Sequence, residues 1–334
     1  MQGLTMNISI TNDCNRRCQY CFQRSWYLPQ KVGQSVKEMS VEDFEQLLIW
    51  FVKSIPVQHD SLKLLGGEPL LHSRIYDIIN TLEQWRVPYS IISNISVDSS
   101  IITKLLPIAH HLSGWLVNSD YPSNQREVFI TNFKVLCSTT NSISVSTTVL
   151  PDSTEIQKAA FRIKELVEIY KSIRGNTESL NIRLSPNSPN PSNGQFVSYD
   201  FSADLANFFN IAWSAGQTQA NFDCKINYCE LTENAINEFR KAGIGIPTGQ
   251  CTPNSGCPFD VLVDGSIIWC SSANFIKLKS WRDYADYDQA MKAITDLWTE
   301  KWKSMSMKCN WQTCGKFNPA LCHGLCIAKN EFIK

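Results

Sequence analysis

Six strand-like segments separated by helical patterns constrain the fold of this chain most. The strand-like segments are residues 6–11, 61–65, 89–94, 115–120, 142–149 and 180–185. The helical patterns between them are residues 40–51, 75–85, 99–108, 126–136 and 152–173. This alternation predicts an α/β fold with a parallel sheet built from right-handed βαβ units. Because a full barrel needs eight such units, we expect an open or partial barrel with catalytic residues at the carboxyl ends of its strands.

The character of the chain changes after the sixth strand. A stretch rich in turn-forming residues, 185–194, is followed by expected helices at about 204–215, 231–242 and 296–304 and by a hairpin at 260–269 with an Asp264-Gly265 turn. We therefore expect three parts: a barrel over 1–215, a helical bridging segment over 216–250, and a small cysteine-rich domain over 251–334.

Charge and hydropathy exclude several classes of protein. Lysine plus arginine and aspartate plus glutamate each number 31, so the chain lacks the basic excess of a nucleic-acid binder. No apolar run reaches the roughly 18 residues that a membrane span needs, and the N-terminus lacks a signal-peptide pattern. We expect a cytoplasmic protein. In that reducing compartment, 13 cysteines indicate metal binding or catalysis rather than a disulfide framework.

Three of these cysteines stand close together directly after the first expected strand. Cys14, Cys18 and Cys21 have C-x3-C-x2-C spacing in the loop that leaves it. A [4Fe–4S] cluster is normally held by cysteine thiolates, one for each iron. Three ligands within eight residues can bind one cluster and leave one iron without a protein ligand. An open iron beside a strand end indicates chemistry rather than structure alone.

With Tyr20 before the last cysteine, and Gly66-Gly67-Glu68-Pro69 after the second strand, the pattern resembles the radical SAM superfamily. The resemblance implies a TIM-like partial (β/α)6 barrel, with S-adenosylmethionine (SAM) bound to the open iron of the [4Fe–4S] cluster. One electron would cleave SAM to methionine and a 5′-deoxyadenosyl radical. A plain strand–helix turn is the alternative for the glycine pair.

Candidate SAM-contacting residues follow from the resemblance and from their positions at strand ends. The resemblance assigns Tyr20, Gly66, Gly67, Glu68 and Pro69. The strand ends add Ser93, Asn94, Asp120, Arg126, Ser146, Arg183 and Ser185. For each of these, a structural or solvated role is the alternative. Arg183 is favoured, because an arginine in an otherwise buried strand needs an anionic partner.

The C-terminal cysteines resemble the SPASM extension of radical SAM enzymes, which holds auxiliary [4Fe–4S] clusters. By position, the first cluster would be held by Cys251, Cys257, Cys270 and Cys326, and three corners of a second by Cys309, Cys314 and Cys322. The usual final cysteine is absent. The second cluster would therefore have an open iron, a non-cysteine ligand, or a ligand from Cys224, Cys229 or His323, or one auxiliary cluster would exist alone. A structural zinc site is the alternative for residues 309–326.

The resemblance implies a peptide-modifying enzyme whose substrate is a precursor peptide. Relatives often carry an N-terminal recognition domain, and this chain starts at the first strand, so we expect a separate peptide-recognition protein or a very short substrate. The reductant would be a flavodoxin or ferredoxin. Two alternatives are dehydrogenation or rearrangement of a small metabolite, and a non-catalytic iron–sulfur or zinc-stapled binding protein.

Overall fold

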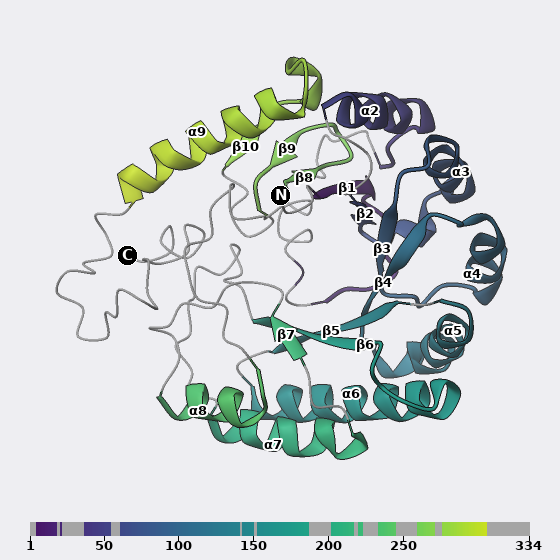
Figure 1. The fold of residues 1–334 in the computed structure, drawn as a ribbon, viewed down its shortest axis with the longest axis vertical. Helices are drawn as coiled ribbons and strands as arrows, with labels where there is room; N and C mark the ends of the chain where they lie inside the picture. Colours follow the sequence, from purple (N-terminus) through teal and green to yellow (C-terminus); the bar gives the residue numbers. More distant parts are fainter. Residues whose placement is uncertain are drawn as a thin grey trace.

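The computed structural model describes residues 5–18, 21, 37–54, 61–140, 142–149, 152–186, 202–216, 220–222, 233–244, 259–270 and 276–305. Its strands form one sheet in the order β10-β9-β8-β1-β2-β3-β4-β5-β6-β7. The sheet curves around the interior, and helices cover its outer side (Figure 1). Among the described residues, most buried apolar side chains form one large core cluster, and Leu262 and Ile268 form a second, small one.

The six predicted strands all exist. They are β1 (Thr5–Thr11), β2 (Ser61–Gly66), β3 (Tyr89–Ser93), β4 (Leu112–Asn118), β5 (Ile143–Val149) and β6 (Leu180–Pro186). Each pairs with the next in parallel, and a short strand, β7 (Ala220–Phe222), extends the parallel array beyond β6. The predicted α/β fold with a parallel sheet is therefore confirmed.

The helices between these strands lie close to their predicted bounds. They are α2 (Val41–Ser54), α3 (Ile75–Trp85), α4 (Ser99–Leu105), α5 (Arg126–Thr139) and α6 (Ser153–Arg174), followed by α7 (Ser202–Ala212) and α8 (Glu233–Lys241). The ends of α6 show why sequence reasoning succeeds here. The Asp152 carboxylate accepts a hydrogen bond from the amide of Glu155, and Gly175 ends the helix in the left-handed conformation at φ 81°.

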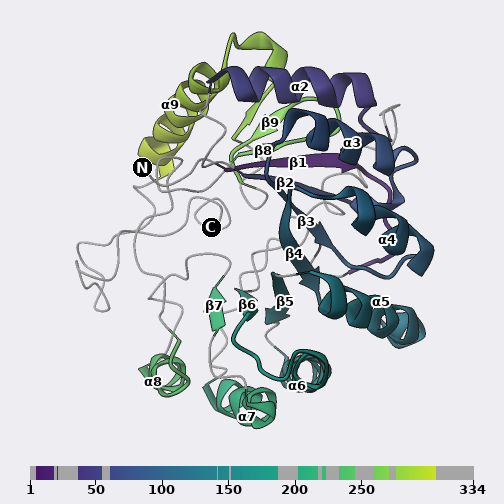
Figure 2. The same cartoon turned by 45° about the vertical axis from the view of Figure 1, so that its right-hand side comes forward.

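The predicted hairpin is also present, and it joins the barrel sheet. β8 (Asp260–Val261) pairs antiparallel with β9 (Ile267–Ile268), which pairs with β10 (Lys277–Leu278). β8 also runs parallel to β1, and the side-chain amide of Asn7 donates to the carboxylate of Asp260 at 2.6 Å. Figure 2 shows this hairpin lying beside β1. The sequence predicted the hairpin but not its partner strand.

The last described helix, α9 (Tyr287–Met305), begins nine residues before its predicted start at Asp296. It packs near α2 (Figure 2). The contact is aromatic: the rings of Trp50 and Phe51 in α2 pack on Tyr287, which stacks on Phe259 with ring centroids 4.8 Å apart. This long-range packing stabilises the N-terminal part of α9, which the local pattern does not predict.

Several predictions fall on residues outside the described ranges. These are Tyr20, Cys224, Cys229, Cys251, Cys257, Cys309, Cys314, Cys322, His323 and Cys326. The division into domains at residues 216 and 251 stays a prediction. Among the described residues, no helix is long and apolar enough to cross a membrane.

Candidate active site

The cysteine loop leaves β1 at the carboxyl edge of the sheet, as predicted. Cys14 is exposed, Cys18 and Cys21 are half-buried, and none of the three forms a disulfide. The amide of Cys21 donates to the carbonyl oxygen of Cys18 at 3.2 Å, which turns the loop back on itself. The pKa of Cys14 is raised to about 11, mainly by desolvation; the hydrogen bond from the Arg16 amide lowers it, and the charges of Glu68, Cys18 and Cys21 add to the rise.

These thiols suit an iron–sulfur cluster by their chemistry. Three cysteines in one loop match the donor type of a [4Fe–4S] site, and Cys18 and Cys21 lie close enough to Cys14 to raise the pKa of its thiol. Ligation requires thiolates, so metal binding would release the protons that the raised pKa retains. Within the described ranges, no three His, Cys, Asp or Glu side chains are already arranged as ligands of one metal ion.

The glycine pair lies directly against the start of this loop. A Cβ on Gly66, whose φ is +146°, would lie 2.4 Å from the carbonyl oxygen of Thr11, and one on Gly67 would lie 2.2 Å from that of Asp13. The amides of Gly67 and Glu68 donate to the same two carbonyls, each at 2.7 Å. Glycine is thus required because two backbone segments touch. The close approach that the sequence analysis attributed to a ligand is made here to the cysteine loop.

Glu68 lies completely buried beneath this contact. Its carboxylate accepts hydrogen bonds from the Ser93 hydroxyl at 2.7 Å, the Asn94 amide at 2.7 Å and the Leu70 amide at 3.1 Å. Burial raises the pKa of Glu68, and the three hydrogen bonds and the charge of Arg16 oppose that rise. Pro69 begins a buried 3-10 turn, Pro69–Leu71. The Glu68 carboxylate therefore links the glycine turn to the end of β3. Its backbone amide links the same turn to the cysteine loop at Asp13.

The turn after β3 is strained. Ile95 has φ +46°, a conformation that a β-branched residue rarely adopts. The side-chain amide of Asn132 in α5 donates to the carbonyl oxygens of Ile95 at 2.7 Å and Val97 at 2.8 Å. This turn directs the Asn94 side chain toward the cysteine loop, where its amide donates to Asn15 at 2.9 Å and lies 3.9 Å from the Cys14 sulfur.

Sequence analysis missed Arg16, which stands between two predicted ligands and is only 8% exposed. Its guanidinium reaches the ends of β3 and β4 and lies 5.6 Å from the ring centre of Phe129. Nothing in the sequence separates it from Arg17, which is exposed. Burial of a charged side chain in a loop was therefore visible only in the structure.

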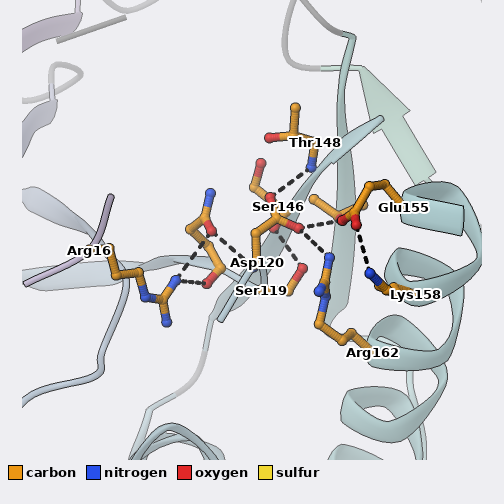
Figure 3. A network of polar contacts seen from close by, with 10 residues as sticks. Arg16, Ser119, Asp120, Ser146, Thr148, Glu155, Lys158 and Arg162 are labelled. Atoms are coloured by element: carbon orange, nitrogen blue, oxygen red, sulfur yellow. Dashed lines mark hydrogen bonds and ion pairs between the residues drawn. The ribbon is translucent and has the colours of Figure 1, made fainter. Parts of the chain in front are cut away.

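Asp120 is engaged with α6. Its carboxylate accepts hydrogen bonds from the Thr147 hydroxyl and the Thr148 amide, and it forms an ion pair with Arg162, each at 3.1 Å. Figure 3 shows Asp120 between Arg16 on one side and Arg162 on the other. These contacts of Asp120 connect the end of β4 to β5 and α6, which is a structural role. Its predicted contact with SAM stays a prediction.

The other strand-end candidates lie farther along the same edge. The hydroxyls of Ser146 and Ser185 are 3.1 Å apart, and Arg183 is half-buried opposite Ser146 in the β5–β6 register. Arg126 forms an ion pair with Glu165 in α6. Among the C-terminal cysteines, the structure describes Cys270, which is half-buried directly after β9. The structure thus gathers Cys14, Cys18, Cys21, Gly66–Pro69, Ser93 and Asn94. It places Asp120, Arg126, Ser146, Arg183 and Ser185 toward β4–β6.

This arrangement can be compared with known proteins. Residues 8–104 match the family model described as the radical SAM superfamily. The matched stretch contains the cysteine loop and the glycine turn. It ends before the C-terminal cysteines, so the SPASM-type resemblance stays a prediction.

Similar sequences cover a short part of this chain. It is 32% identical over 77 residues to the GTP 3′,8-cyclase of Trichormus variabilis, covering 23% of this chain and 22% of that protein. The chain thus matches less than a quarter of the length of this curated relative.

Similar structures cover nearly all of the chain. Streptococcus suis SuiB bound to S-adenosylmethionine matches with a TM-score of 0.61 and 14% identity, over 98% of this chain and 73% of SuiB. SuiB bound to the precursor peptide SuiA matches with a TM-score of 0.61 and 13% identity, over 98% of this chain and 72% of SuiB. At these identities, the likeness concerns the fold.

Proposed function

We propose that this protein is a radical SAM enzyme that reductively cleaves SAM and abstracts a hydrogen atom from a peptide by means of the 5′-deoxyadenosyl radical. The product would be a post-translational modification of a ribosomal peptide natural product: a crosslink, an epimerised or oxidised residue, or an excised backbone segment. Cys14, Cys18 and Cys21 would hold the [4Fe–4S] cluster, which supplies the electron for SAM cleavage when bound.

One observation carries this proposal: the glycine turn and Glu68 touch the loop that bears the three cysteines, within the stretch that matches the radical SAM model. The protein's own contribution is to position this loop. The amides of Gly67 and Glu68 hold its start, and Glu68 connects the turn to Ser93 and Asn94. The polar side chains at these strand ends would orient SAM, together with Tyr20, Ser146, Arg183 and Ser185.

The peptide substrate rests on two supports. SuiB, whose fold covers nearly all of this chain, has been solved with its precursor peptide SuiA. The C-terminal cysteines resemble the SPASM extension of peptide-modifying enzymes. We accordingly propose one or two auxiliary [4Fe–4S] clusters, with Cys270 among the ligands of the first. The partners would be a precursor peptide, a separate recognition protein, and flavodoxin or ferredoxin as reductant.

A second candidate is the rearrangement or dehydrogenation of a small metabolite. It is favoured by the curated sequence relatives, whose name, GTP 3′,8-cyclase, specifies a nucleotide substrate. The genes beside this one in its host separate the two candidates. A short peptide gene supports the peptide substrate, and a cluster of genes for sugar or amine enzymes supports the metabolite.

Anaerobic reconstitution with iron, sulfide, dithionite and SAM tests the radical SAM activity itself. We expect 5′-deoxyadenosine from the wild type and none from Cys18→Ala. Cys137→Ala is the matched control, since Cys137 is a free thiol buried in α5, away from the cysteine loop. A wild type that holds its clusters intact and yields no 5′-deoxyadenosine would refute the enzymatic proposal. The iron content of the reconstituted protein, at about four irons per cluster, distinguishes one cluster from two or three. Its zinc content tests the alternative of a structural zinc site.

A further inference from the structure

Arg16 is a buried cation to which the proposed function assigns no role. It lies inside the cysteine loop, between Cys14 and Cys18, and it is 8% exposed. Arginine is almost never buried without partners, because removing its charge from water costs several kcal/mol. Its partners therefore indicate what the residue does.

The guanidinium of Arg16 joins three elements. Its Nη2 donates to the carbonyl oxygen of Asn94 at 2.9 Å and to the Ser96 hydroxyl at 2.7 Å, both in the strained turn after β3. Its Nη1 donates to the carbonyl oxygen of Asn118 at the end of β4 at 3.2 Å. Its Nε donates to the Gln125 amide oxygen at 3.2 Å, directly before α5. A planar fork with five donors can make these contacts together, whereas lysine cannot.

The same turn connects Arg16 to the candidate ligands. The Asn94 peptide groups link two charges, since its N–H donates to Glu68 and its carbonyl accepts from Arg16. The Arg16 amide lies 3.4 Å from the Cys14 sulfur, and the Asn94 side-chain amide lies 3.9 Å from it. Hydrogen bonds to ligating sulfurs and nearby net charge are the means by which proteins set the potential of an iron–sulfur cluster.

We propose that Arg16 is a positioning residue that fixes the cysteine loop on the ends of β3 and β4, and that its buried charge raises the reduction potential of the cluster. This inference rests on the proposed cluster at Cys14, Cys18 and Cys21. A cation favours the reduced cluster, which carries one more negative charge. A unit charge about 10 Å from a redox centre, at an effective dielectric of about 20, changes its equilibrium constant about tenfold.

Two variants of Arg16 separate charge from position. Arg16→Met removes the charge and the donors, and Arg16→Lys keeps the charge without the planar fork. Asn132→Ala is the matched control. Asn132 holds the same strained turn from α5 and is uncharged, so its loss loosens the turn without altering the local charge.

An EPR-monitored redox titration of the reconstituted cluster and amide hydrogen exchange of the iron-free protein provide the readouts. We expect Arg16→Met to lower the equilibrium constant for reduction about tenfold, which is about 59 mV for one electron. Arg16→Lys and Asn132→Ala should retain the wild-type potential. Exchange at residues 94–97 should quicken in all three variants.

An unchanged potential in Arg16→Met, or an equal shift in Asn132→Ala, would overturn the role of the charge. Unchanged exchange in Arg16→Met would overturn the positioning role. If Arg16→Met takes up no iron, Arg16→Gln replaces it as the uncharged variant. A wild type that binds no iron at Cys14–Cys21 refutes the proposed function instead, and the exchange experiment still tests the positioning role.

Discussion

The contact between Gly67 and the cysteine loop leads to a sharp prediction for Gly67→Ala. The added Cβ would lie 2.2 Å from the carbonyl oxygen of Asp13 and 2.8 Å from that of Asn12. Both neighbours are backbone atoms, so the collision cannot be relieved by a side-chain rotation. Either the glycine turn or the cysteine loop must move.

The size of the effect follows from what this movement breaks. Overpacking costs about 1–3 kcal/mol. Separating the two segments also weakens the hydrogen bonds from the Gly67 and Glu68 amides, at about 1 kcal/mol each. We expect Gly67→Ala to lower the free energy of unfolding by about 3–5 kcal/mol and to impair iron loading, because the loop that carries Cys14 shifts.

Chemical denaturation, amide exchange and iron content measure these effects together. Gly175→Ala is the matched control, since Gly175 has φ +81° with nothing within 4 Å of the added Cβ. Gly175→Ala measures the cost of placing a side chain at a positive φ without a steric clash, whereas Gly67→Ala measures the cost of a clash with backbone atoms. We expect Gly175→Ala to destabilise the protein by about 1 kcal/mol and to load iron normally. Wild-type stability and iron loading in Gly67→Ala would show that the loop does not lie on the glycine turn as described.

Two further predictions concern ionised groups away from the cysteines. Asp120→Asn removes the partner of the mostly buried Arg162 and should lower the free energy of unfolding, measured by thermal unfolding, by about 2–3 kcal/mol. Asp77→Asn, in an exposed ion pair, should lower it by less than about 1 kcal/mol. Equal losses in the two variants would contradict the first estimate. For Glu83, burial raises the pKa, but hydrogen bonds from His111 and Tyr89 outweigh it and lower the pKa overall. This group therefore stabilises the fold above the ordinary glutamate pKa of about 4.3, and that stability is lost as pH falls through its lowered folded pKa. Glu83→Gln should flatten this acid limb of the stability curve measured by urea unfolding, and an unchanged limb would contradict the assignment.

Local patterns predicted the repeating part of this fold well. The helix over residues 75–85 and the ends of α6 follow from apolar spacing and from caps within a few residues, information that the sequence carries locally. The cysteine loop and glycine turn were likewise predictable as neighbours, because successive parallel strands end at one edge of a sheet. The structure confirms that arrangement.

Non-local contacts account for what the sequence did not predict. The N-terminal part of α9 depends on Trp50 and Phe51, which lie more than 200 residues away in the sequence. The burial of Arg16 depends on four segments meeting at the ends of β3 and β4, and no periodicity encodes that meeting. The role of the glycine pair was attributed to a ligand because sequence reasoning cannot show that another stretch of backbone occupies the same position.

The pairing of β1 with β8 has a consequence for synthesis of the protein. Asn7 and Asp260 are separated by 253 positions, so one edge of β1 waits for its partner while the intervening chain is made. At about 5–20 residues per second, that wait lasts about 10–50 s on the ribosome. An unpaired strand edge is a template for wrong pairing with other chains. The nascent barrel is therefore most prone to aggregation before Asp260 emerges. Binding of a chaperone to the nascent chain, or a low rate of expression, would favour correct closure of the barrel.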